Sequence, residues 1–123
     1  MSPGEPAGEV RGAEHPAQYS ILQYAGPGQV VVNVGVLLVD PVRDTLYLRL
    51  RSDWQAVAQP GDDEVLALLE AELGWEAERI GAFALLASLE DNLSNTVRVT
   101  DRQPVQVADF DEALAALYGR HVP

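Results

Sequence analysis

The sequence predicts a single α+β domain in which an antiparallel sheet of about four strands carries helices packed on one face. Runs of β-branched or alternating apolar residues predict the strands, and they fall at 18–24, 29–39, 45–51 and 95–107. Apolar residues at helical spacing follow Pro60 and recur at the C-terminal end. The expected order is β-β-β-α-α-β-α, and 123 residues with 47% hydrophobic content suffice for one buried core.

The first three strands are expected to form an antiparallel meander. "GPG" at 26–28 supplies the first turn, and "DPVRD" at 40–44 supplies the second. The stretch 45–51 alternates strictly, with Leu46, Leu48 and Leu50 on one face and Thr45, Tyr47, Arg49 and Arg51 on the other. Residues 1–17 are rich in Pro, Gly, Glu and Ala without periodicity, so we expect a flexible N-terminal tail before a single domain at 18–123.

Helices are expected in three places after the meander. The first, "DDEVLALLEAELG", opens with acids and closes on Gly74. The second covers 75–91, although "AFALLASL" within it can also pass for a strand, and the last begins after the cap residue Asp109. Pro104 should end or border the strand at 95–107. The expected core-facing helical residues are Val65, Leu66, Leu69, Leu73, Ile80, Phe83, Ala84, Ala87, Leu114 and Leu117.

Composition excludes several classes of function. The chain has 19 acidic residues against 8 basic ones, a formal charge of −11, and every basic residue is an arginine. The missing lysine removes the phosphate-binding lysine of a P-loop, and the negative charge opposes binding to nucleic acid or anionic lipid. Without cysteine there is no disulfide and no thiolate zinc site. No signal-peptide or membrane-spanning run occurs, so a cytoplasmic protein is expected.

A cluster of arginines is expected on the open face of the sheet. Strand alternation places Tyr47, Arg49 and Arg51 on the same face as Arg98, and Arg102 follows in the same stretch. Clustered cations repel one another unless anions compensate them. The face could therefore dock an acidic partner or a phosphate-bearing ligand, or neighbouring carboxylates could pair with it locally.

Asn33 and Gly35 interrupt the apolar strand "VVVNVGVLLVD". Alternation places both on the face opposite the expected core row, which consists of Val30, Val32, Val34, Val36 and Leu38. A glycine inside a strand commonly marks a bulge or the close approach of another backbone, and a nearby asparagine can bond the backbone freed there. The alternative is that Asn33 contacts a ligand or partner across the glycine gap.

Four segments resemble the bacterial domain of unknown function 3037 family, of which this chain would be a divergent, short member. They are "YSILQY", "VNVGVLLVDP", "NTVRVTDRQPVQV" and "DEALAALYGRHV". Where that family tends to carry a glutamate before the asparagine and a histidine after Pro-Val, this chain has Val30 and Gln106. The family has no established activity, and its members often sit beside genes for HipA-like kinases. The resemblance therefore implies a HipA-like kinase as a candidate partner.

The sequence gives little support to a catalytic motif. A Nudix-like alignment is met by Glu72 and Gly74, but Ala67, Leu68 and Ala71 stand where the other essential residues should be, and one carboxylate cannot hold a phosphate-bound metal. The two histidines, His15 and His121, lie near the ends of the chain. We therefore expect no catalytic residue, no metal site and no cofactor.

The sequence favours a non-catalytic protein-interaction or regulatory module over an enzyme. It would dock a partner through the arginine-bearing sheet face or through an open sheet edge, which could also support a homodimer. The alternative is a protein that binds, or acts on, a small carboxylate or phosphate in a pocket near Asn33, Tyr47 and Arg49. The candidate binding residues are Asn33, Gly35, Tyr47, Arg49, Arg51 and Arg98.

Overall fold

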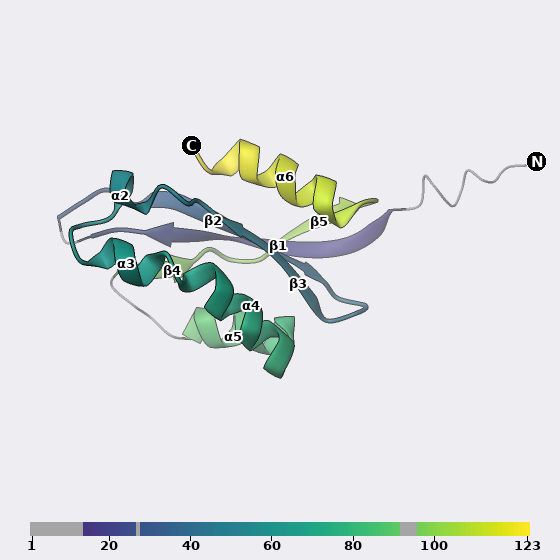
Figure 1. Ribbon diagram of the computed structural model, residues 1–123. Coiled ribbons are helices and arrows are strands. Elements are labelled where there is room, and N and C mark those ends of the chain that lie inside the picture. Colours follow the sequence, from purple (N-terminus) through teal and green to yellow (C-terminus); the bar gives the residue numbers. More distant parts are fainter. Residues whose placement is uncertain (1–13, 27, 92–95) are drawn as a thin grey trace, which may run out of the picture.

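The computed structural model describes residues 14–26, 28–91 and 96–123, and it confirms an α+β fold built on an antiparallel sheet (Figure 1). The central strand β1 (His15–Tyr24) pairs with β2 (Val32–Asp40), and β2 pairs with β3 (Thr45–Leu50). On its other side β1 pairs with both β4 (Val97–Val99) and β5 (Gln103–Val107). The predicted meander is confirmed, and the stretch expected to be one strand at 95–107 forms two short strands.

The strand boundaries differ from those expected at the N-terminal end. β1 begins at His15, so residues 15–17 of the expected tail belong to the sheet, where Pro16 lies opposite Gln106. The remaining tail residues, apart from Glu14, lie outside the described residues. Pro104 lies within β5, which pairs only with β1 among the described strands. Proline is tolerated there because an edge strand has one side without ladder bonds.

The helices have different boundaries from those predicted. They are α2 (Trp54–Val57), α3 (Asp62–Leu66), α4 (Leu69–Ile80), α5 (Ala82–Asp91) and α6 (Phe110–His121). The prediction that a helix ends at Gly74 is wrong, because α4 continues to Ile80 and the break falls at Gly81, whose φ is 93°. A glycine adopts this conformation at little cost. Asp44, in the β2–β3 turn, accepts hydrogen bonds from the next two helical amides, those of Ala82 and Phe83.

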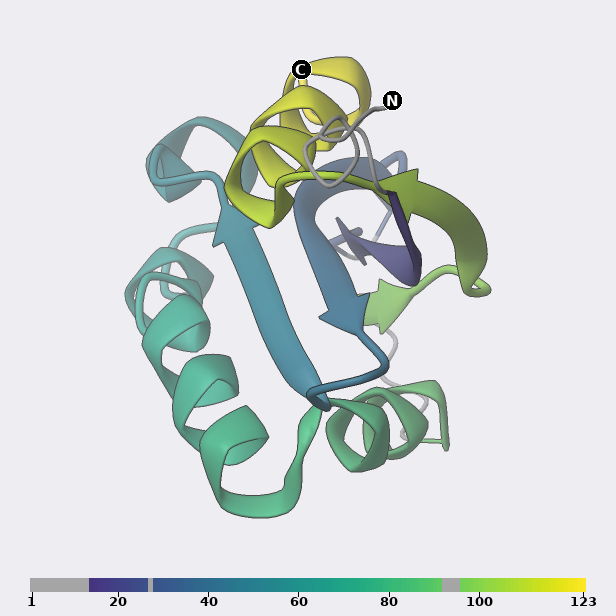
Figure 2. The ribbon, with the colours of Figure 1, turned by 90° about the vertical axis from the view of Figure 1, so that its right-hand side faces the viewer.

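Helices cover both faces of the sheet, and the expectation that they pack on one face is wrong. Leu117 and Val122, in and just after α6, pack with Val36 and Leu38 of β2. On the opposite face, helices α4 and α5 contribute Leu73, Ala82, Leu85 and Leu86 to a cluster with Leu37 and Val39. Figures 1 and 2 show α6 on one side of the sheet and α4 and α5 on the other. The reason is that β2 is apolar on both faces, and such a strand requires cover on both.

Several helical residues face away from the core, contrary to expectation. Val65 is 67% exposed, and Ala84 and Ala87 are exposed, whereas Leu85 and Leu86 are buried. The break at Gly81 resets the helical phase, so a pattern continued across it points to the wrong side. No helix in the described ranges is long and apolar enough to cross a lipid bilayer.

Candidate functional site

Asn33 and Gly35 form a β-bulge, as the structural interpretation of the sequence predicted. Leu22 lies opposite Gly35 and Gln23 lies opposite Asn33, so Val34 is an extra residue in β2. A Cβ added to Gly35 would lie 2.8 Å from the Cγ of Leu50 and 3.1 Å from the carbonyl oxygen of Arg49. The glycine is therefore needed for close packing between β2 and β3.

The extra residue places Asn33 on the opposite face from Gly35, and the expectation that they share a face is wrong. The Nδ2 group of Asn33 donates to the carbonyl oxygen of His121 at 3.0 Å, and its Oδ1 accepts from the Nε2 group of Gln23 at 3.0 Å. Asn33 thus joins the bulge to the end of α6. Both polar atoms of this half-buried side chain bond the protein's own groups.

The sheet face that carries Tyr47 and Arg49 is covered by α6. The ring of Tyr47 stacks on that of Phe110, with centroids 4.9 Å apart and planes 16° apart. The guanidinium carbon of Arg49 lies 4.2 Å from the centre of the Tyr118 ring, a cation–π contact. The open arginine-bearing face expected from the sequence is therefore not formed.

Three further arginines, one in β4 and two next to strands, also have partners within the chain. Arg51 makes two hydrogen bonds to Asp53, of 2.7 and 2.8 Å. This pairing raises the pKa of Arg51 and lowers the pKa of the Asp53 carboxyl. Arg98 donates to Gln23 at 3.4 Å, and Arg102 donates to both carboxylate oxygens of Glu90. Local pairing, which the sequence left open as the alternative, accounts for Arg51 and Arg102.

The structure does not bring Asn33, Tyr47 and Arg49 together in one pocket. Asn33 lines an open depression of about 490 Å³ together with Val32 and the last residues of the chain. Tyr47 and Arg49 are not among the residues that line this depression, and their side chains pack instead on Phe110 and Tyr118 of α6. A small-molecule site composed of those three residues has no geometric support.

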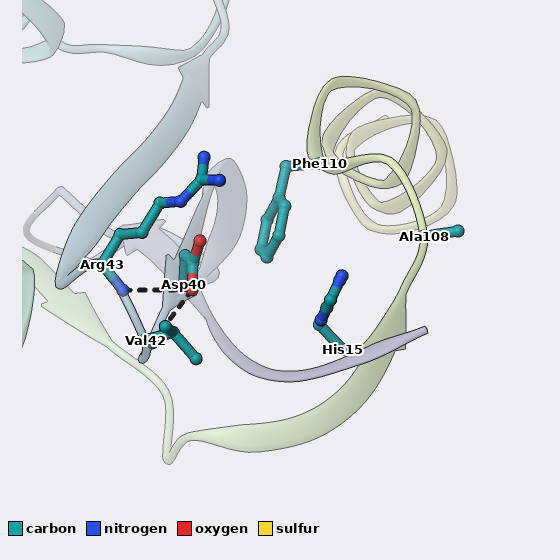
Figure 3. Close-up of a pocket in the computed structure, with 6 residues that line it drawn as sticks. All are labelled: His15, Asp40, Val42, Arg43, Ala108 and Phe110. Carbon is teal, nitrogen blue, oxygen red and sulfur yellow. Dashed lines mark hydrogen bonds between the residues drawn. The ribbon is translucent and has the colours of Figure 1, made fainter. Parts of the chain in front are cut away.

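A second depression, of about 250 Å³, lies where β1 begins and β5 leads into α6 (Figure 3). His15, Asp40, Arg43 and Phe110 are among its lining residues. The Oδ1 atom of Asp40 accepts hydrogen bonds from the backbone amides of Val42 and Arg43, at 3.0 and 3.4 Å. Asp40 therefore stabilises the β2–β3 turn and places a carboxylate in the same depression as Arg43 and His15.

The outer edge of β3 differs from these two depressions, because it carries backbone groups that point away from the rest of the sheet. The amide of Arg51 donates to Val34 in β2, whereas the amide of Leu50 points outward and donates to the Glu70 carboxylate at 2.9 Å. Backbone groups alternate along an antiparallel strand, so those of Leu46 and Leu48 also point outward. Within the described ranges, no residue hydrogen-bonds these outward groups of Leu46 and Leu48.

A groove of about 530 Å³ runs along this edge between β3 and α4. Leu46 and Leu48 line one side, and Gly74, Ala77 and Gly81 line the other. A Cβ added to Gly74 would meet no described atom within 4 Å, although glycine inside a helix costs about 1 kcal/mol relative to alanine. Packing does not require this glycine, and the lack of a side chain here leaves the groove open on the α4 side.

Sequence reasoning missed this groove. Its signal was Gly74, which lies within a continuous helical pattern and was interpreted as the end of the helix. Among the described residues, no group of three or more His, Cys, Asp and Glu side chains is placed to hold a metal ion. Comparisons with protein-family models, curated proteins and solved structures found no match. The resemblance to the domain of unknown function 3037 family therefore stays a prediction.

Proposed function

We propose that this protein is a non-catalytic interaction module that binds an extended segment of a partner protein along the outer edge of β3. The groove between β3 and α4 is the observation that carries the proposal. An incoming strand would bond the outward backbone groups of Leu46 and Leu48, and main-chain bonds of this kind provide the affinity in strand addition. The Leu46 and Leu48 side chains, which line the groove, would select apolar residues in the segment.

The contacts around the groove define where such a segment would lie. Glu70 already bonds the amide of Leu50, so the added strand would pair with the Thr45–Leu48 part of β3. Gly74 and Ala77 would let its backbone pass close to α4, since small residues permit close approach. The expected ligand is a short extended segment with apolar residues and few acids, because two acids, Asp44 and Glu78, line the groove against one base, Arg43.

A second copy of this chain fits the groove less well than a different protein. Pairing two β3 edges would bring two α4 helices together, and α4 carries Glu70, Glu72, Glu76 and Glu78 with a single arginine. Like charges brought together in this way repel one another. A HipA-like kinase, which the family resemblance implies as a partner, is one candidate source of the segment.

The proposal can be tested with short random peptides displayed on phage and selected on the immobilised protein. Gly74→Gln should block the groove without disturbing the helix, since glutamine is a good helix former and a Cβ at Gly74 meets open space. Gly119→Gln is the matched control, because Gly119 also lies in a helix with no described atom within 4 Å of an added Cβ.

Selected peptides should bind the wild type and Gly119→Gln equally, and should bind Gly74→Gln at least about tenfold more weakly, a loss of ~1.4 kcal/mol. Bound peptide should also slow hydrogen exchange at the amides of Leu46 and Leu48. The proposal fails if the peptides bind all three proteins alike, or if those two amides exchange at the same rate with and without peptide.

A further inference from the structure

An apolar stripe on the outer side of α3 and α4 is exposed to solvent. Val65, Leu68 and Trp75 are 67%, 60% and 74% exposed. A turn at residues 67–68 separates the two helices, and within it the amide of Leu68 donates to the carbonyl oxygen of Val65. Leu68 and Trp75 are seven residues apart, close to two helical turns, so they lie on one side.

The same helical segment buries its opposite side. Leu66 and Leu73 are 6% and 5% exposed and belong to the core clusters beneath the sheet. Figure 2 shows α4 with the sheet on one side and open surroundings on the other. The core therefore accounts for Leu66 and Leu73 but not for Leu68 and Trp75, and an exposed apolar patch of this kind is typical of a binding surface.

The segment that carries the stripe is strongly acidic, although Asp62 and Glu70 face other partners, the hydroxyl of Tyr24 and the amide of Leu50. Between residues 62 and 80 the chain has seven acids and one base: Asp62, Asp63, Glu64, Glu70, Glu72, Glu76 and Glu78 against Arg79. Arg79 is already paired with Glu76 at 2.7 Å. Glu72, four residues after Leu68 along α4, is exposed and lies beside it on the helix surface, and Glu64 of α3 is also exposed.

A hollow of about 550 Å³ adjoins the stripe between α2 and α3. Three carboxylate residues line it, Asp53, Asp63 and Glu64, together with apolar groups such as Ala67. Asp53 is paired with Arg51, and Asp63 accepts a 3.3 Å hydrogen bond from the amide of Gly61. The hollow has the size and the charge to receive a lysine or arginine side chain from outside.

We infer that this surface binds a basic amphipathic helix of another protein. The apolar side of that helix would cover Leu68 and Trp75, and its lysines or arginines would lie between Glu64 and Glu72 and enter the hollow. A second copy of this chain would bring like charges together, so charge complementarity favours a cationic partner. The inference does not rest on the β3 groove, because the stripe lies on a different side of α4 from Gly74 and Ala77.

The probe is a synthetic amphipathic helical peptide of lysine and leucine, and the control is a peptide with glutamate in place of lysine. Trp75 belongs to the stripe and is exposed, and Trp54, 4% exposed, lines the hollow, so a change in tryptophan emission reports on the proposed surface as a whole. The lysine peptide should shift the emission to shorter wavelength in a saturable way, and the shift should weaken as salt is added. The glutamate peptide should leave it unchanged.

Leu68→Gln should weaken binding of the lysine peptide about tenfold, because it removes a leucine that becomes buried in the complex. The matched control is Val42→Gln, which removes an exposed apolar residue elsewhere, 81% exposed, and should bind as the wild type does. Circular dichroism and thermal melting should show both variants folded as the wild type is.

Three results would overturn the inference. In one, saturating lysine peptide leaves the emission unchanged. In another, Leu68→Gln and Val42→Gln bind the peptide equally well. In the third, sedimentation of the free protein shows self-association that Leu68→Gln abolishes, which would assign the stripe to a second copy of this chain.

Discussion

Replacing Gly35 by alanine should destabilise the domain, because the space beside the bulge is already filled. The new Cβ would lie 2.8 Å from the Cγ of Leu50 and 3.1 Å from the carbonyl oxygen of Arg49. Leu50 is 6% exposed, and its amide is bound by Glu70, so neither its side chain nor its backbone can retreat freely. Overpacking of this kind costs about 1–3 kcal/mol.

Part of this cost is offset in the unfolded state. Alanine restricts the unfolded chain more than glycine does, which stabilises the folded protein by about 0.4–1 kcal/mol. The net loss for Gly35→Ala should be about 1–2 kcal/mol in the free energy of unfolding. For a chain of this length each kcal/mol lowers Tm by roughly 4 °C. Gly74→Ala, where a Cβ meets open space, should gain about 0.5–1 kcal/mol.

Urea unfolding followed by tryptophan fluorescence would measure both variants against the wild type. Both substitutions add the same methyl group. Opposite signs of the change in the free energy of unfolding would therefore isolate the effect of local packing. The reasoning would be refuted if Gly35→Ala were as stable as the wild type or more stable, with an unchanged dependence on urea. A shift of the same sign in both variants would show that backbone entropy, and not the contact with Leu50, controls the result.

Three further predictions concern polar contacts. Asp109→Ala removes the cap of α6, so the free energy of unfolding should fall by about 1 kcal/mol in urea titrations, and an unchanged value would contradict the capping role. Asn33→Ala removes two hydrogen bonds and should cost about 1–2 kcal/mol, with faster hydrogen exchange around His121 than in the wild type. Because Arg51 lowers the pKa of Asp53, the stability from this pair should be present above the ordinary aspartate pKa and be lost as pH falls through the lowered value. In Arg51→Gln, carbon-detected NMR titration should show the Asp53 pKa rising toward the ordinary value, and an unchanged pKa would exclude the pairing as its cause.

Local signals in the sequence were sufficient for most of the individual elements. Alternation over 45–51 predicted β3, whose observed bounds are Thr45–Leu50. Asp109 was expected to cap the last helix, and its side chain accepts a hydrogen bond from the amide of Glu112 at 3.0 Å. Both features depend on residues close together in the chain, and for that reason pattern and capping chemistry were sufficient.

The placement of the helices could not be predicted in the same way. An apolar stripe on the last helix shows that this helix packs on something, but not on which face of the sheet. The apolar character of β2 on both faces was the available signal, and it required cover on both sides. Once α6 covers the face that bears Tyr47 and Arg49, the candidate site expected there is replaced by internal contacts.

The bulge explains why the candidate site was also misjudged at Asn33. A single extra residue in a strand moves the following side chains to the other face. Alternation alone therefore placed Asn33 beside Gly35, whereas it bonds the end of α6. The groove along β3 was missed because the predicted helix ends at Gly74, whereas α4 continues past Gly74 and ends at the break at Gly81.

The position of β1 has a consequence for the order in which the protein can fold. β1 is the first described strand in the chain, yet β4 and β5, two of its three partners, come after α5. During synthesis the β1–β2–β3 meander emerges first, and one side of β1 must stay unpaired until residues 97–107 follow. Contacts between such distant segments slow folding, and the growing chain exposes an open strand edge until those residues are made. Completion of the sheet therefore waits for β4 and β5.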